Sequence, residues 1–123
     1  MTIEKVAQIG VRVHDVQRAV LFYQDVLGLV LLFQAPELAL FQCGALRLFL
    51  SLSEGPRFDH PASIVYYQVS DLDRAYRELK AKGVAFEDAP HQVGQLGDRA
   101  VWMALFSDTE GNVLAITDER PII

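Results

Sequence analysis

The sequence has little of several features that mark particular classes of protein. Its one cysteine, Cys43, has no partner for a disulfide within the chain. Lys and Arg number 11 against 16 Asp and Glu, and no basic cluster is present to bind nucleic-acid phosphates. No apolar run approaches the roughly 18 residues of a membrane-spanning helix, and the N-terminus lacks the pattern of a signal peptide. These scarcities predict a cytoplasmic protein that binds neither nucleic acid nor membrane.

Apolar residues, by contrast, are plentiful. They make up 51% of the 123 residues, which is enough for a folded core and excludes general disorder. A chain of this length fits one compact domain.

One segment of the sequence occurs twice. Residues 13–19 read VHDVQRA, and residues 69–75, about half the chain later, read VSDLDRA. In both copies an alternating apolar strand precedes an Asp, and apolar residues at helical spacing follow it. Asp15 and Asp71 are therefore predicted helix N-caps. Because repeats of this kind indicate duplicated units, we expect two copies of one supersecondary structure that enclose a shared cleft.

The remaining elements follow the same order in both halves. The pattern predicts a strand, a helix and three strands, at residues 7–13, 16–27, 29–33, 38–42 and 45–52, and again at 64–69, 72–82, 84–86, 90–97 and 100–106, with an additional last strand at 113–117. Gly28 and Gly83 end the helices, Gly111 supplies a positive φ in the last hairpin, and part of residues 90–97 is expected to form a loop. The predicted organisation is a first βαβββ module at 1–53, a linker at 54–61 and a second module at 62–123.

Two stretches carry a resemblance to a known family. Residues 13–15 leading into 22–29 (FYQDVLGL), and residues 69–73 with 106–112 (FSDTEGN), make the chain similar to the vicinal oxygen chelate superfamily, which includes glyoxalase I, extradiol dioxygenases and bleomycin-resistance proteins. Thr109 stands where the family usually has proline. The resemblance implies an α+β fold, in which two tandem βαβββ modules form a curled eight-stranded cup with helices outside. It also implies a homodimer.

The resemblance further implies where a metal would bind. The family's metal enzymes place one ligand on the first and one on the last strand of each module, and these positions fall at Gln8, Phe49, Ile64 and Ala115. Among these four, only Gln8 has a side chain that can donate to a metal. The three histidines, His14, His60 and His91, show no ligand spacing and are expected at the rim or in loops. We therefore predict no metal and no cofactor.

The same register gives a candidate ligand site. Alternate residues of a strand lie on the same face. Four such sets are predicted, one on each of four strands: Gln8, Gly10 and Arg12; Arg47, Phe49 and Ser51; Ile64, Tyr66 and Gln68; and Val113, Ala115 and Thr117. Apolar walls with a few polar groups are typical of small-molecule sites. The predicted ligand-binding residues are Gln8, Arg47, Phe49, Ile64, Tyr66, His91, Trp102 and Ala115. An inward Arg needs a partner, either an acidic side chain at the rim or an anionic ligand, and the acidic side chain is favoured.

Three functions fit these observations. The favoured one is a metal-independent binding protein of the bleomycin-resistance type, which holds an aromatic or amphipathic molecule in an apolar cup. The second is an enzyme, either a divergent glyoxalase-like lyase or isomerase that uses Gln8, or a metal-free catalyst that uses His91. The third is a structural or partner-binding module whose cup is filled by its own side chains.

Overall fold

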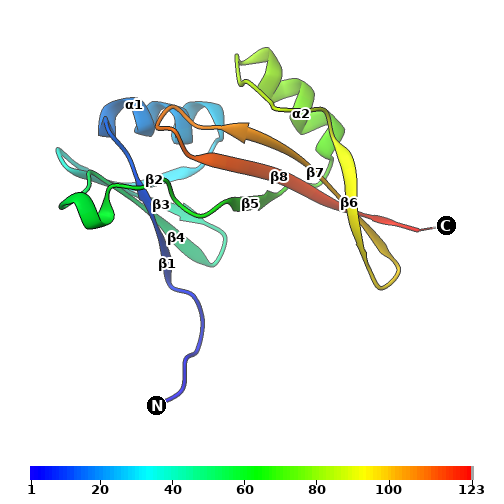
Figure 1. Cartoon of the computed structure of the whole chain (residues 1–123), viewed down its shortest axis with the longest axis horizontal. Coiled ribbons are helices and arrows are strands. Elements are labelled where there is room, and N and C mark those ends of the chain that lie inside the picture. The colour runs from blue at the N-terminus through cyan, green and yellow to red at the C-terminus, as the bar shows by residue number, and fades with distance from the viewer. Residues whose placement is uncertain (123) are drawn as a thin grey trace. The chain divides into compact units, whose positions relative to one another are not determined.

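The computed structural model describes residues 1–122, which divide into two compact units. Unit 1 comprises Met1–Ala62 together with Thr109–Asn112, and unit 2 comprises Ser63–Asp108 and the chain from Val113. Each unit contains a strand, a helical segment and three further strands (Figure 1). The α+β class and the two βαβββ modules predicted from the sequence are therefore confirmed.

Unit 1 contains the first four-stranded sheet, sheet 1. Its strands are β1 (Gln8–Arg12), β2 (Val30–Ala35), β3 (Leu38–Cys43) and β4 (Leu46–Ser51), in the spatial order β1-β4-β3-β2. Strands β1 and β4 are parallel, and the other pairs are antiparallel. Helix α1 (Val16–Leu21) continues as a π-helix, Phe22–Val26. The linker contains one short 3₁₀-helix, Pro56–Phe58.

Unit 2 contains sheet 2, with the equivalent order β5-β8-β7-β6. Its elements are β5 (Val65–Gln68), α2 (Leu72–Ala81), β6 (His91–Leu96), β7 (Arg99–Ser107) and β8 (Val113–Pro121). The strand predicted at residues 84–86 is wrong, because only Phe86 makes a bridge, to Phe106. The eight strands thus form two hydrogen-bonded sheets of four within the described residues.

Both repeated Asp residues cap their helices as predicted. The Asp15 carboxylate accepts a hydrogen bond from the Arg18 amide at 3.0 Å, and the Asp71 carboxylate accepts one from the Arg74 amide at 3.1 Å. Gly28 and Gly83 have φ values of 77° and 91°, in the left-handed region that favours glycine after a helix.

The cap at Asp71 gives a testable expectation. Asp71→Ala should destabilise the protein by about 1 kcal/mol, because the first turn of α2 loses its side-chain acceptor. Asp71→Asn should cost less than half of that, since asparagine is an equally good cap. Urea denaturation followed by circular dichroism measures both, and equal losses for the two variants would contradict a capping role.

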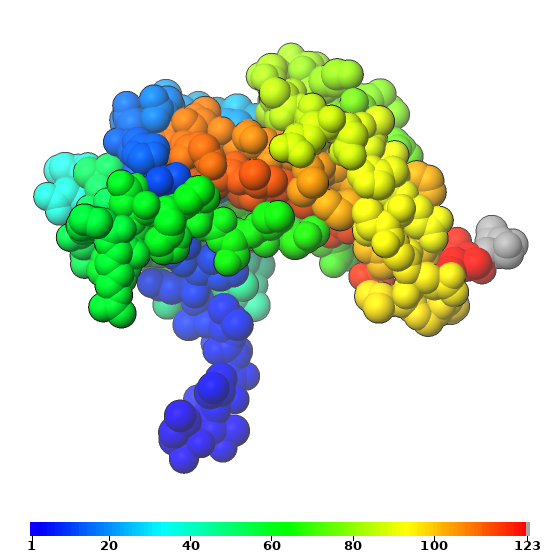
Figure 2. All heavy atoms as spheres, in the orientation of Figure 1, coloured from blue at the N-terminus to red at the C-terminus, as the bar shows by residue number. Residues whose placement is uncertain are grey.

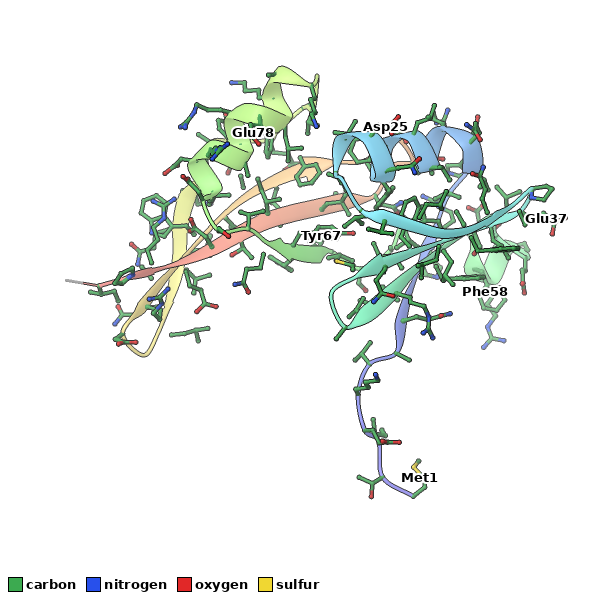
Figure 3. All side chains as sticks on the ribbon, turned by 180° about the vertical axis from the view of Figure 1, so that it is seen from behind. Met1, Asp25, Glu37, Phe58, Tyr67 and Glu78 are labelled. Carbon is green, nitrogen blue, oxygen red and sulfur yellow. The ribbon has the colours of Figure 1, made fainter. Side chains whose placement is uncertain are left out.

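Each sheet packs one face against its own helix. In unit 1 this contact buries five strand side chains and three from α1 and the π-helix fully or almost fully: Val11, Ala39, Phe41, Leu48 and Leu50, with Ala19, Val20 and Tyr23. In unit 2 the corresponding residues are Ala104, Phe106, Leu114 and Ile116, and the Phe106 ring lies 5.3 Å from that of Phe86. We call the opposite side of each sheet its open face; side chains stand on both sides of each ribbon in Figure 3.

The N-terminal residues take no part in this packing. Residues 1–6 extend away from the strands of unit 1, as the separate run of blue atoms in Figure 2 shows, and all six are exposed.

Candidate ligand-binding site

The open face of sheet 1 combines an apolar row with a polar row. Register places Gly10, Phe49, Leu40 and Phe33 side by side across the four strands. Phe49 and Leu40 are half-buried, while Phe33 is 56% exposed. The neighbouring row joins Gln8, Arg47, Gln42 and Val30. Gln8, Arg47 and Phe49 therefore share one face, as the alternation predicted.

The open face of sheet 2 carries most of the other predicted residues. One row joins Tyr66, Ala115 and Leu105, and the next joins Gln68, Thr117, Met103 and His91. Tyr66 and Ile64 are 56% and 43% exposed, whereas Ala115 is fully buried. Tyr66 and Ala115 thus lie together as expected, and Ala115 itself has no surface to offer a ligand.

His91 lies on strand β6, although the sequence suggested a loop there. Its Nδ1 is 3.0 Å from the Ala89 carbonyl oxygen and 3.5 Å from Oδ2 of Asp88. Because His91 pairs with Met103, it belongs to the row that also contains Thr117. The imidazole is exposed.

Trp102, one of the predicted ligand-binding residues, lies on the other face of sheet 2 from Tyr66 and Ala115. Trp102 pairs with Asp118, whose carboxylate accepts a hydrogen bond from the Leu72 amide at the start of α2, so both residues lie on the helix side of sheet 2. The Arg120 guanidinium covers the indole at 4.2 Å from the ring centroid. This cation–π contact gives Trp102 a structural partner away from Tyr66 and Ala115.

The four positions that the family uses for a metal do not form a donor set in this chain. Gln8 offers an amide oxygen, but Phe49, Ile64 and Ala115 have no donor atom. Among residues 1–122, no three or more His, Cys, Asp or Glu side chains lie close enough together to hold a metal ion. The residues present therefore do not fit the family's metal.

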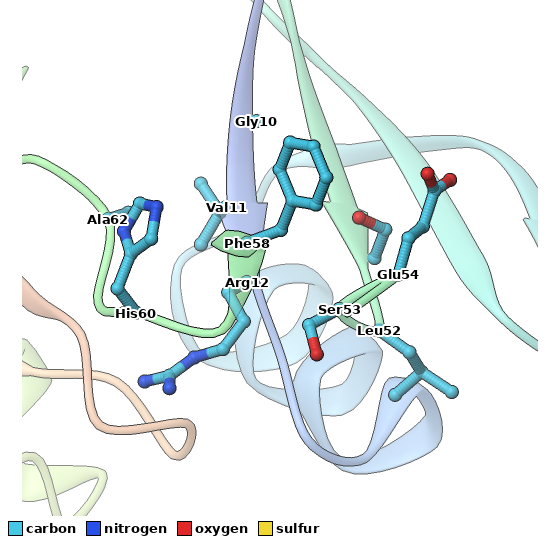
Figure 4. Close-up of a pocket in the computed structure, with 10 residues that line it drawn as sticks. Gly10, Val11, Arg12, Leu52, Ser53, Glu54, Phe58, His60 and Ala62 are labelled. Atoms are coloured by element: carbon cyan, nitrogen blue, oxygen red, sulfur yellow. The ribbon is translucent and has the colours of Figure 1, made fainter. Parts of the chain in front are cut away.

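One pocket opens at the end of the open face of sheet 1. Its volume is about 210 Å³, and Figure 4 shows Arg12, Phe58 and His60 around it. It is lined by the ends of β1 and β4 and by the linker: Gly10, Val11, Arg12, Ser51, Leu52, Ser53, Glu54, Phe58, His60 and Ala62. The sequence did not indicate this pocket, because only the fold brings the linker over the strand ends.

Two arginines on this face differ in their partners. The Arg12 side chain is 13% exposed, and its Nη1 donates to the Asp59 carboxylate at 2.9 Å, so the predicted acidic partner of an inward Arg is confirmed for Arg12. Its Nε is buried without a hydrogen-bond partner among the described residues. Arg47 is exposed and contacts the Gln8 amide oxygen at 3.5 Å. Among the described residues, the ion pairs shorter than 4.0 Å involve other cationic side chains, and none involves Arg47.

Glu110 has a structural role that the sequence did not reveal. Its side chain is fully buried, and it accepts hydrogen bonds from the amides of His14 and Asp15 at 2.7 and 2.9 Å, from the Arg18 guanidinium at 2.7 and 3.1 Å, and from the Thr109 hydroxyl at 2.8 Å. Burial raises the pKa of Glu110, but these hydrogen bonds outweigh it and lower the pKa from 4.5 to about 2. The charged carboxylate therefore fastens the loop 109–112 to the start of α1, within unit 1.

Comparison with known proteins agrees with the two-module fold. The family model described as the Glyoxalase/Bleomycin resistance protein/Dioxygenase superfamily matches residues 5–116. The chain belongs to this superfamily. It is 31% identical to the Bacillus subtilis (strain 168) protein called "Uncharacterized protein YraH", over 91% of this chain and 96% of that one.

Solved structures of superfamily members show the same fold. A superfamily member from Sphaerobacter thermophilus DSM 20745 superimposes with a TM-score of 0.79 at 23% identity, covering 95% of this chain and 98% of that one. A lactoylglutathione lyase from Agrobacterium tumefaciens gives a TM-score of 0.75 at 18% identity, with 94% of each chain covered. At these sequence identities the similarity establishes the fold and does not establish the activity.

Proposed function

We propose that this superfamily member binds a small aromatic or amphipathic molecule, without a metal, on the open face of sheet 1. One observation carries the proposal: sheet 1 buries Phe41, Leu48 and Leu50 on its helix side, yet leaves Phe33 exposed and Phe49 half-buried on its open face, which ends in a pocket of about 210 Å³. Concave apolar surfaces with a few oriented polar groups are typical of small-molecule sites. Arg12, Ser51 and His60 supply such groups at the pocket.

The side chains at the family's metal positions support independence from metal. A ligand held by Phe49 and Leu40 gains affinity from buried apolar area and aromatic stacking. Neither contribution needs a cation. Gln8 is then a hydrogen-bonding group beside Arg47.

The proposal also covers the location, oligomeric state and partners of the protein. We expect a cytoplasmic homodimer, without nucleic-acid or membrane partners, in which Cys43 stays a free thiol. No helix among residues 1–122 is long and apolar enough to cross a membrane. Burial raises the pKa of the Cys43 thiol, which disfavours the reactive thiolate.

A second candidate, a glyoxalase-like lyase or isomerase, is supported by the position of His91. With Nδ1 directed at the Ala89 carbonyl, Nε2 is the ring nitrogen left to exchange a proton with a substrate on the open face of sheet 2. This candidate differs from the first in predicting turnover of a bound aldehyde or thiohemiacetal, which is lost in His91→Ala.

A neutral fluorescent probe tests the favoured function. N-phenyl-1-naphthylamine brightens on entering an apolar site, and we expect saturable binding of one probe per chain, with a Kd unchanged by excess EDTA. Phe49→Asp should weaken binding about tenfold or more, because the ring's buried contact is lost and a charge must be desolvated. Phe33→Asp, on the edge strand β2, should also raise the Kd.

Leu21→Asp provides the matched control. Leu21 is 49% exposed on α1, so the same change in charge on the helix side should leave probe affinity within twofold. Absence of saturable binding in the wild-type protein would favour a module filled by its own side chains. Stoichiometric bound metal that disappears in Gln8→Ala would contradict the proposal.

A further inference from the structure

We propose that Arg47 makes this site selective for anions: the preferred ligand is an aromatic or amphipathic molecule that carries a carboxylate, sulfonate or similar negative group. This inference rests on the proposed function, and it names the ligand class and the residue that recognises it.

The charges on the open face of sheet 1 support this selectivity. The chain as a whole is acidic, with a net charge of −5. The strands of this face nevertheless contribute two arginines, Arg12 and Arg47, and no Asp or Glu. Asp59 from the linker neutralises Arg12. Arg47 is therefore the uncompensated positive group beside the apolar row.

The neighbours of Arg47 fit anion recognition. Arg47 pairs with Gln8 on one side and Gln42 on the other, and neither side chain neutralises its charge. The Gln42 amide nitrogen donates to the carbonyls of Gly44 and Leu46, which fixes that side chain next to the guanidinium. A planar guanidinium with several N–H donors matches the two oxygens of a carboxylate or sulfonate.

The spacing between the two rows fits an aromatic anion. Arg47 and Phe49 are two residues apart on β4 and so lie on one face, about 7 Å apart along the strand. A ring packed on Phe49 and Leu40 leaves a substituent at its edge within reach of the flexible Arg47 side chain. The same molecule thus contacts the apolar row and the charge.

Two matched probes test the inference. 8-Anilino-1-naphthalenesulfonate carries the same ring system as N-phenyl-1-naphthylamine plus one sulfonate. We expect Arg47→Gln to weaken binding of the sulfonate probe about tenfold, since a charge-assisted hydrogen bond is lost, and to change the Kd of the neutral probe less than twofold. Arg77→Gln, an exposed position on α2 with the same change in net charge, should leave both affinities within twofold. Arg47→Lys keeps the charge but loses the planar set of donors, so it should recover only part of the sulfonate affinity.

The two probes separate this inference from the proposed function. If the neutral probe binds but Arg47→Gln leaves sulfonate affinity unchanged, or Arg77→Gln weakens it equally, anion selection by Arg47 is overturned and the binding function stands. If neither probe binds the wild-type protein saturably, the proposed function fails, and this inference with it. Circular dichroism of each variant confirms that losses of affinity come from folded protein.

Discussion

Replacing Glu110 by Gln should remove about 3 kcal/mol of folding free energy at neutral pH. The pKa of Glu110 falls from 4.5 to about 2 on folding, and each pKa unit corresponds to about 1.4 kcal/mol. The carboxylate is fully buried and accepts hydrogen bonds from Arg18, Thr109 and two backbone amides. A glutamine side chain at this position would retain the shape but lose the charge, and its NH₂ group would face donors.

The same residue predicts a dependence of stability on pH. Because the folded-state pKa is depressed, the stabilisation is fully present above pH 4.5 and is lost as the pH falls from there through about 2. The Glu110→Gln variant should lack this component, so its stability should fall less steeply over that interval.

Urea denaturation at a series of pH values measures both effects. Glu78→Gln is the control, since Glu78 forms an exposed pair with Arg74 at 2.9 Å, and such pairs contribute less than about 1 kcal/mol. Equal losses of unfolding free energy in the two variants would contradict the role given to Glu110. So would a Glu110→Gln variant whose stability falls with pH as steeply as that of the wild-type protein.

Phe106→Ala should destabilise the protein by about 3–5 kcal/mol, whereas Tyr66→Ala should cost under about 1 kcal/mol. Both residues lie in sheet 2, but on opposite faces. Phe106 is fully buried and packs against Phe86, so its removal leaves a cavity. Tyr66 is 56% exposed on the open face and loses little buried area.

Thermal unfolding monitored by calorimetry compares the two variants. The contrast tests whether the open face of sheet 2 is separate from the core. A loss for Tyr66→Ala as large as that for Phe106→Ala would show that this face is packed in the protein in solution.

Local patterns were sufficient to predict much of the fold. Asp15 and Asp71 could be predicted as helix caps because a short carboxylate accepts hydrogen bonds from the free backbone amides of the first helical turn. Gly28, Gly83 and Gly111 adopt the positive φ values expected at their turns. Alternation also placed Gln8, Arg47 and Phe49 correctly on one face.

Other features depend on tertiary contacts that local patterns do not encode. Both faces of β7 are apolar, with Trp102 and Phe106 on one and Met103 on the other, so alternation carried no information about which face Trp102 would take. The linker pocket and the buried Glu110 join segments far apart in the chain. The last strand was predicted to end at residue 117, but β8 continues to Pro121, and Asp118 and Arg120 have partners on the helix side.

A crystal structure of the protein with N-phenyl-1-naphthylamine, grown without chelator, is the most direct test of the central claim. We expect the naphthyl ring against Phe49 on the open face of sheet 1, with no metal ion beside Gln8. A ring bound between α1 and the sheet, or an ion held by three or more protein donors that include Gln8, would contradict it.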